Sequence, residues 1–300
     1  MIFEEFYAKY ANELCLELVG GQEGIARSIT VPEVERPGLS LIGYLKGFSK
    51  KSILVFGKAE IELLKDLSSQ KRVLSLKKIL GVKTPFVVLS QHLHPPHEMV
   101  NLCDKEKIPL LRSTLTTLNL INRLTTLLTE VFAPNLSCHG SLVDIYGIGV
   151  LIQGESAIGK SEAALGLVER GHRLISDDIV KIKKREGEYL EGSGVDVSRH
   201  HMEVRGIGII NIARLYGAVG VMEKKSLDIV VKLEVWDDSH FYDRSGHKEE
   251  MISLLGVDIP YYLLPVKAGR DVVLLLETIA LSYRLKILSA IERKGKQRLW

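Results

Sequence analysis

Residues 150–161 read Val150-Leu151-Ile152-Gln153-Gly154-Glu155-Ser156-Ala157-Ile158-Gly159-Lys160-Ser161. An apolar, strand-like run ends at Gly154, and the pattern G-x-x-x-x-G-K-S follows at once. A loop of this pattern turns successive backbone N–H groups toward phosphate oxygens, and the next helix points its positive N-terminal end at the same place. Lys160 is expected to reach the outer phosphates, and the Ser161 hydroxyl to bind Mg²⁺. The stretch therefore predicts a nucleotide or polyphosphate site.

The residues after this loop support the same interpretation. Glu162 to Arg170 read as a helix, so the loop has a strand before it and a helix after it. The alternative is a glycine-rich turn that only starts a helix. The residues expected to bind the nucleotide or polyphosphate are Gly154, Glu155, Ser156, Ala157, Ile158, Gly159, Lys160 and Ser161.

Length and composition bound the possibilities. A chain of 300 residues is long enough for two domains, and its net charge of +3 gives no reason to expect a nucleic-acid partner. Cys15, Cys103 and Cys138 are odd in number and scattered, which favours a reducing compartment over a disulfide framework. The N-terminus carries acidic residues ahead of any apolar stretch, and no apolar run reaches membrane-spanning length. We therefore expect a cytoplasmic protein without a membrane partner.

The first part of the chain alternates predicted strands and helices. Apolar residues at helical spacing from Phe3 to Leu18, stopped by Gly20-Gly21, predict the first helix. The further predicted strands span residues 29–34, 52–57, 86–89 and 108–111, and the further helices span 59–67 and 96–105. This alternation predicts a small α/β domain.

A long Leu/Thr-rich helix is predicted to close this domain and to link it to the next. It runs from Ser113 to Val131, and Ala133-Pro134-Asn135 breaks it. We therefore expect an N-terminal α/β domain over residues 1–134, of uncertain role, and a second domain over residues 135–300.

Two adjacent carboxylates end an apolar strand predicted over residues 172–180. In a regular strand neighbouring side chains point to opposite faces, so only one of Asp177 and Asp178 would face the phosphates. Charges this close raise each other's pKa, which suits a group that must accept and return a proton. The alternative is a solvated strand end with an Asx turn, but the phosphate loop nearby favours a functional pair.

The stretch from residue 202 to 211 reads M-E-V-R-G-I-G-I-I-N. Glu203 and Arg205, two residues apart, share one face of an extended segment, and two glycines allow close approach of the backbone. Glu203 would complete a Mg²⁺ shell and Arg205 would hold phosphate oxygens. A structural ion pair at a glycine-rich bend is an equally good interpretation of these residues alone.

Two later loops also carry basic residues. A predicted strand over residues 227–236 leads into a polar loop that contains Tyr242-Asp243-Arg244. The glycine-bearing segment Pro265-Val266-Lys267-Ala268-Gly269-Arg270 precedes a long amphipathic helix from Val272 to Leu288. Each of Arg244, Lys267 and Arg270 alone is typical of a protein surface. They would have a functional role if both loops converge on the phosphate loop.

Together these segments resemble one family. In chain order they are His139-Gly140, the loop at 154–161 followed by Glu162, R-G-H-R-L-I-x-D-D at 170–178, the segment 202–211, Y-D-R at 242–244 and P-V-x-x-G-R at 265–270. They are similar to the HPr kinase/phosphorylase family, bacterial enzymes that act on a serine of the phosphocarrier protein HPr. The segment 202–211 is far more specific to this family than the phosphate loop, whose pattern is widespread.

The resemblance implies a role for each matching residue. Asp178 would be the base for the target serine, with Asp177 beside it. The implied catalytic residues are His139, Lys160, Asp177, Asp178 and Arg244, and the implied Mg²⁺ ligands are Ser161 and Glu203. The segment implied to serve both reaction directions is Met202, Glu203, Val204, Arg205, Gly206, Ile207, Gly208, Ile209, Ile210 and Asn211, and the loop implied to serve the reverse reaction is Pro265, Val266, Lys267, Ala268, Gly269 and Arg270.

The resemblance also implies an activity and an architecture. The enzyme would phosphorylate HPr with ATP or pyrophosphate, require Mg²⁺, and reverse the reaction with inorganic phosphate to release pyrophosphate. It would assemble as a homohexamer, regulate carbon metabolism, and have a P-loop kinase domain resembling phosphoenolpyruvate carboxykinase. Ala157 stands where the family usually has glycine, and Ala268, in the loop implied to serve the reverse reaction, stands where the family usually has proline.

Two other functions fit the phosphate loop. One is a regulatory switch that binds nucleotide and signals to a partner, and the other is a small-molecule kinase. The aspartate pair beside His139 favours catalysis over a switch, because binding alone needs no proton acceptor.

Overall fold

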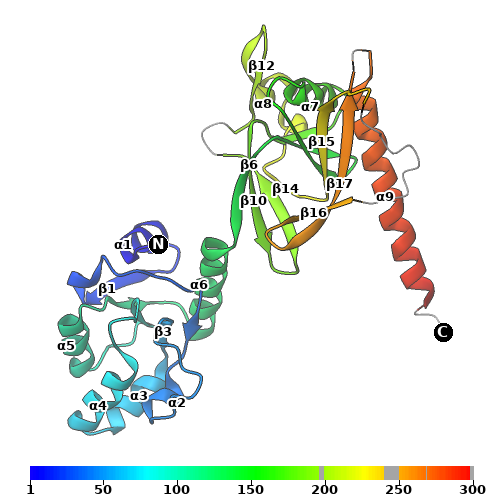
Figure 1. Cartoon of the computed structure of the whole chain (residues 1–300). Helices are drawn as coiled ribbons and strands as arrows, with labels where there is room; N and C mark the ends of the chain where they lie inside the picture. Colours follow the sequence, from blue (N-terminus) through cyan, green and yellow to red (C-terminus); the bar gives the residue numbers. More distant parts are fainter. Residues whose placement is uncertain (196–198, 240–249, 268, 298–300) are drawn as a thin grey trace. The chain divides into compact units, whose positions relative to one another are not determined.

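The chain divides into two compact units, Met1–Phe132 and Ala133–Trp300. The computed structural model describes residues 1–195, 199–239, 250–267 and 269–297, with side chains up to Ala290 (Figure 1). Arg244 and Ala268, both singled out from the sequence, lie outside these residues. No helix among the described residues is both long and apolar enough to cross a membrane.

The first unit is built on a five-stranded sheet of order β1-β5-β4-β3-β2. Its strands are β1 (Leu16–Gly20), β2 (Val34–Glu35), β3 (Ile53–Phe56), β4 (Val87–Leu89) and β5 (Leu110–Ser113). Strands β2 to β5 are parallel, and β1 adds to β5 in the antiparallel sense. The parallel strands β3 and β4 at the middle of this sheet are fully buried, which fits their unbroken apolar sequences.

Helices connect these strands and cover the sheet. They are α1 (Phe3–Tyr10), α2 (Gly38–Leu41), α3 (Lys58–Asp66), α4 (Ser69–Ile79), α5 (His97–Glu106) and α6 (Thr117–Phe132), with a short 3-10 turn η1 at Gln22–Gly24. Helix α6 buries Leu120, Leu124 and Leu128 in the core of this unit. Its packing therefore makes it part of the first unit.

Two sequence predictions for this unit are wrong. The single helix expected from Phe3 to Leu18 ends at Tyr10, and β1 follows. The apolar residues of the second half, at positions 14, 16 and 18, alternate with period two, and β1 pairs with β5. The strand expected over residues 29–34 is reduced to the two residues of β2.

The second unit contains a six-stranded sheet of order β16-β17-β15-β8-β7-β9. Its strands are β7 (Ser141–Ile145), β8 (Ile148–Gly154), β9 (Arg173–Ser176), β15 (Ile229–Val235), β16 (Glu250–Leu254) and β17 (Val257–Val266). The central strands β8, β15 and β17 are parallel, so their carboxyl ends share one edge of the sheet. In open sheets with parallel strands, ligands bind at that edge.

One face of this sheet is covered by helices and the other by a second sheet. Helices α7 (Lys160–Glu169) and α9 (Val272–Gln297) pack on the first face, and Leu167 and Leu276 are fully buried there. The second sheet packs on the other face, where Ile175, Val180 and Leu190 lie in one apolar cluster. This sheet has the order β14-β11-β10-β6 and consists of β6 (Asn135–His139), β10 (Ile179–Arg185), β11 (Tyr189–Ser193) and β14 (Lys224–Ser226).

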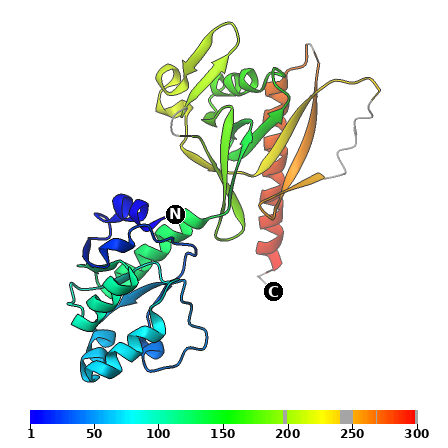
Figure 2. The ribbon, with the colours of Figure 1, turned by 60° about the vertical axis from the view of Figure 1, so that its left-hand side comes forward.

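A separate hairpin completes the unit. Strands β12 (His201–Val204) and β13 (Gly208–Asn211) pair with each other, and α8 (Ile212–Tyr216) and the 3-10 turn η3 (Ala218–Gly220) follow. Met202 and Val204 are buried in the same cluster as α7, so the hairpin lies against that helix, and Figure 2 shows both.

Candidate active site

The phosphate loop takes the conformation that its glycines allow. Gly154, Ala157 and Gly159 all have left-handed backbones, with φ of 148°, 70° and 100°. A Cβ at Gly154 would come within 2.7 Å of the Leu233 carbonyl oxygen, so the close approach of β8 to β15 requires glycine there. Left-handed residues interspersed in a turn aim backbone N–H groups into one concavity, which is the geometry of an anion-binding nest.

The first residues of α7 bring charge and a hydroxyl to this nest. Gly159 caps the helix, so Lys160 and Ser161 form its first turn. The Lys160 ammonium donates hydrogen bonds to the carbonyl oxygens of Gly154 and Glu155, over 3.0 and 2.8 Å. The positive charge is therefore held over the loop, next to the positive end of the helix dipole.

Asp177 and Asp178 do not belong to a continuous strand, so the predicted strand over residues 172–180 is wrong. β9 ends at Ser176 in the six-stranded sheet, and β10 begins at Ile179 in the four-stranded sheet. Asp178 has a left-handed φ of 68° at the bend between them. Because the chain turns here, both aspartates line the same cavity, whereas strand alternation predicted that only one would.

Asp177 is buried and accepts hydrogen bonds on both carboxylate oxygens. Ser141 Oγ donates to Oδ1 over 2.5 Å, and Ser161 Oγ donates to Oδ2 over 2.8 Å. Burial raises the pKa of Asp177, and hydrogen bonds from the Ser141 and Ser161 hydroxyls and from the Asp178 backbone N–H counteract the rise. The charge of Asp178 also raises the pKa, but it ranks last among the causes, and burial ranks first.

Asp178 differs from its neighbour in being exposed. Its Oδ1 lies 3.5 Å from Nδ1 of His139, and the two side chains are 79% and 82% exposed. The contact arises because His139 ends β6 opposite Ile179 in the first pair of the β6–β10 ladder. A solvent-accessible carboxylate beside an imidazole is suited to exchange protons with a substrate.

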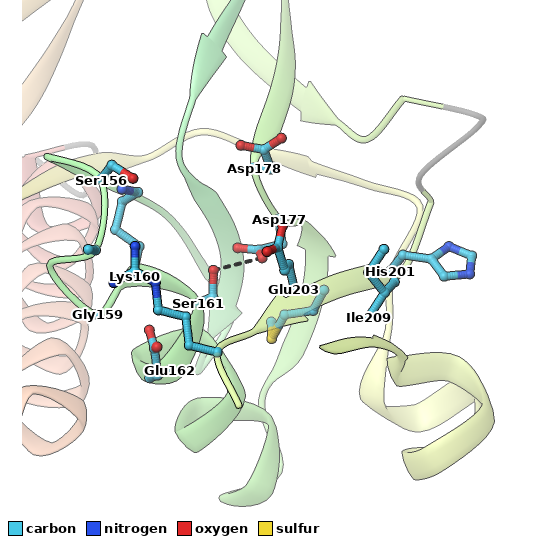
Figure 3. A pocket seen from close by; sticks show the side chains of 13 residues that line it. Ser156, Gly159, Lys160, Ser161, Glu162, Asp177, Asp178, His201, Glu203 and Ile209 are labelled. Atoms are coloured by element: carbon cyan, nitrogen blue, oxygen red, sulfur yellow. Dashed lines mark hydrogen bonds between the residues drawn. The ribbon is translucent and has the colours of Figure 1, made fainter. Parts of the chain in front are cut away.

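The hairpin supplies the opposite wall of the cavity. Glu203 and Arg205 both line it and are exposed, with Glu203 in β12 and Arg205 in the following turn. The cavity has a volume of about 320 Å³ (Figure 3). Its lining residues are Ser156, Ala157, Gly159, Lys160, Ser161, Glu162, Asp177, Asp178, His201, Met202, Glu203, Arg205 and Ile209.

This cavity joins three segments that are far apart in the chain: the phosphate loop, the aspartate bend and the hairpin. Two family models match the chain over nearly its whole length, the HPr Serine kinase N terminus over residues 5–128 and the HPr Serine kinase C-terminal domain over residues 130–295. The chain belongs to the HPr kinase/phosphorylase family.

Curated relatives agree with this assignment. The chain is 41% identical over 280 residues to the HPr kinase/phosphorylase of Halalkalibacterium halodurans, covering 92% of this chain and 90% of that protein. It is 40% identical over 271 residues to the corresponding protein of Bacillus pumilus, covering 90% of this chain and 87% of the relative. The solved HPr(Ser) kinase/phosphatase of Coxiella burnetii covers 53% of this chain and 97% of its own length, with a TM-score of 0.50 and 31% identity.

Some residues to which the resemblance to the HPr kinase/phosphorylase family gives roles do not line the cavity. His139 reaches it only through Asp178. In the loop after β17, Arg270 donates to the Pro265 carbonyl oxygen over 2.8 Å. The Lys267 and Arg270 cations lie 5.5 and 5.9 Å from the centre of the Trp236 ring. This loop follows the carboxyl end of β17, at the same sheet edge as the phosphate loop.

Two residues near the cavity were not singled out from the sequence. His201 directly precedes the segment 202–211, and its spacing of two from Glu203 places both on one face of β12, so strand periodicity contained the signal. Ser141 gave no such signal, because its contact with Asp177 depends on how two strands pair.

Proposed function

We propose that this protein transfers a phosphoryl group from ATP or pyrophosphate to a serine of HPr, and removes it again by phosphorolysis. The proposal is supported by membership of the HPr kinase/phosphorylase family. The observation that carries it is the single cavity in which the loop residues Lys160 and Ser161 meet Asp177 and Asp178. Phosphoryl transfer needs an anion cradle and a group that handles the hydroxyl proton, and this cavity offers both.

The phosphate loop binds the donor. Its backbone N–H groups and the start of α7 hold the phosphates, and Lys160 turns from the loop carbonyls toward the outer phosphate oxygens. Arg205 faces the same cavity and neutralises further charge. We assign the same task to Arg244, which lies outside the described residues.

The cavity suits Mg²⁺. Its candidate ligands, the Ser161 hydroxyl and the Glu203 carboxylate, line the cavity and are hard oxygen donors of the kind that Mg²⁺ prefers, and phosphate oxygens and water would complete the shell. Asp177 accepts a hydrogen bond from the Ser161 hydroxyl, so the lone pairs of the Ser161 oxygen are left for the metal. Bound Mg²⁺ would neutralise charge on the transferring phosphoryl group.

Asp178 is the proposed base. In the forward direction it takes the proton of the HPr serine hydroxyl as that oxygen bonds to phosphorus. The nucleoside diphosphate leaves when ATP is the donor, and phosphate leaves when pyrophosphate is the donor. In reverse, inorganic phosphate attacks phosphoserine, pyrophosphate forms, and the proton returns to the serine oxygen. His139, 3.5 Å from Asp178, assists this transfer. The segment Met202–Asn211 serves both directions, and the loop Pro265–Arg270 serves the reverse reaction.

A transfer assay tests the proposal. The protein is incubated with Mg²⁺, γ-labelled ATP, purified HPr and a panel of metabolites, and the labelled product is located by mass spectrometry. We expect label on a serine of HPr, and its release as pyrophosphate when phosphate is added. Label only on a small molecule would mean a small-molecule kinase, and nucleotide binding without transfer would mean a switch.

We also propose that the protein is a cytoplasmic homohexamer. Leu274, Leu281, Leu285 and Leu288 form an exposed apolar stripe along α9, which supports self-association. Free Cys15, Cys103 and Cys138 fit a reducing compartment. Sedimentation velocity would give the size of the assembly. The relation of the domain to phosphoenolpyruvate carboxykinases stays a prediction.

A further inference from the structure

Ser141 is a buried polar residue next to the active site to which the family resemblance gives no role. It begins β7, is fully buried, and pairs with Ile152 two residues before the phosphate loop. Its hydroxyl donates to Oδ1 of Asp177 over 2.5 Å. It therefore touches the carboxylate that contacts Ser161, yet it does not line the cavity.

A bulge in β9 creates this contact. Val143 pairs with Leu174, and its neighbour in β7, Leu142, pairs with Ser176. Ile175 therefore has no partner in β7 and forms a β-bulge. The extra residue sets Asp177, rather than Ser176, opposite Ser141. Ile175 is itself fully buried and packs with Leu142, so core packing stabilises the bulge and fixes the register at the bend.

The two oxygens of Asp177 thereby have separate partners. Oδ1 is bound inside the fold by Ser141, and Oδ2 is directed at Ser161. A carboxylate held at one oxygen cannot rotate without breaking that hydrogen bond, so its second oxygen stays directed at the Ser161 hydroxyl. We propose that Ser141 is a positioning residue: it fixes Asp177 so that Asp177 orients the Ser161 hydroxyl toward the metal of a metal–nucleotide complex.

This inference rests on the proposed function, because it assigns Ser161 to a Mg²⁺-bound polyphosphate. A purely structural role for Ser141 would predict a different result from a positioning role. If the hydroxyl only satisfied a buried carboxylate, its loss would lower stability and leave the Mg²⁺ requirement unchanged. If it positions Asp177, its loss would change the Mg²⁺ requirement specifically, because outer partners of metal ligands affect metal affinity.

The test uses a matched pair of substitutions in the full-length chain. Ser141→Thr and Ser141→Val add the same bulk at position 141, but only threonine keeps the hydroxyl. Ser141→Ala is the third variant, because it removes the hydroxyl without adding any atom to a buried site. Two quantities are measured for each: the binding of a fluorescent ATP analogue in EDTA and across a Mg²⁺ titration, and kcat and KM for transfer to HPr.

We expect the valine and alanine variants to need about tenfold more Mg²⁺ for half-maximal tightening of nucleotide binding. Their nucleotide affinity in EDTA and their KM for HPr should match wild type, while kcat at limiting Mg²⁺ falls. Threonine should restore the wild-type Mg²⁺ midpoint. If the added methyl group prevents folding of both Thr and Val variants, the alanine variant decides alone.

Two results would overturn the inference. One is a wild-type Mg²⁺ midpoint in the alanine variant. The other is an equal loss of nucleotide binding with and without Mg²⁺, which indicates only structural damage. A wrong proposed function would give a distinguishable result. The wild-type protein itself would then show no Mg²⁺-dependent nucleotide binding or no transfer to HPr.

Discussion

Ser161 and Asp177 are joined by a hydrogen bond of 2.8 Å from the serine hydroxyl to Oδ2 of the aspartate. The bond connects the first turn of α7 to the bend between β9 and β10. From the sequence, the phosphate loop and the paired aspartates were expected to share one site, with one aspartate facing the phosphates. Their direct contact places the proposed phosphate cradle and the aspartate pair in one site.

Replacing Asp177 with asparagine should separate stability from activity. Burial raises the pKa of this carboxyl group, so its ionised form is a cost to the fold that asparagine removes. We expect an unfolding free energy at pH 7 equal to wild type or higher by on the order of 1 kcal/mol. Transfer to HPr should fall at least a hundredfold, because Ser161 loses its charged acceptor. Urea denaturation and the transfer assay measure both, and a stable variant with wild-type transfer would contradict the role of Asp177.

Replacing Ala157 with glycine should relieve strain in the phosphate loop. Ala157 has a φ of 70°, and a left-handed backbone costs a residue other than glycine about 1–2 kcal/mol. The added freedom of glycine in the unfolded chain offsets about 0.4–1 kcal/mol of this. The net gain is at most about 1.6 kcal/mol, so we expect the melting temperature to rise by up to about 6 °C.

The control for this change is Ala163→Gly, in the right-handed backbone of α7. There glycine should lower the melting temperature, since nothing is relieved and helix propensity is lost. A decrease for both variants would show that the loop conformation at Ala157 is not strained.

The hydrogen bonds of the buried Glu277 should make the free energy of unfolding depend on pH in the acid range. His172 Nε2 lies 2.9 Å from one oxygen of Glu277, and Arg170 donates to the other over 2.7 Å. Burial alone would raise the pKa of Glu277, but the hydrogen bonds from His172 and Arg170 outweigh it and lower the pKa. The stabilisation is therefore complete above the ordinary value of 4.5 and is lost as the pH falls through the lowered value.

Glu277→Gln should thus lower the unfolding free energy at pH 7 by about 2 kcal/mol, and the difference from wild type should shrink below pH 4.5. Glu223→Gln is the control, because Glu223 is 74% exposed and pairs with Arg199 at 3.5 Å. Glu223→Gln should lower the free energy of unfolding by less than about 0.5 kcal/mol. A pH-independent difference for Glu277→Gln would contradict the ionic role.

The sequence predicted correctly those helices and strands whose residue pattern is contained in one short stretch of the chain. The strand, loop and helix around Lys160 follow from an apolar run, two glycines and a helical stretch, all between Ile148 and Glu169. The helices α3 and α5 and the strands β3 and β4 were likewise predicted to within two residues. In each of these, the periodicity of the sequence and the packing of the chain agree.

The predictions failed where long-range pairing decides the structure. Nothing local shows that β9 carries a bulge at Ile175, or that the chain changes sheets at Asp178. Both features determine how the aspartates point. At the N-terminus, apolar spacing extended one helix to Leu18, although pairing of β1 with β5 makes Leu16–Gly20 a strand.

The central claim is that Asp178 takes the serine proton in the cavity that binds the nucleotide. It is tested most directly by single-turnover transfer to HPr from saturating Mg²⁺-ATP, with nucleotide affinity measured in parallel, for Asp178→Asn and for the exposed control Asp258→Asn. The account predicts that Asp178→Asn binds ATP within about twofold of wild type while transfer falls by at least about a hundredfold, and that Asp258→Asn changes neither. Transfer by Asp178→Asn at the wild-type rate would contradict it.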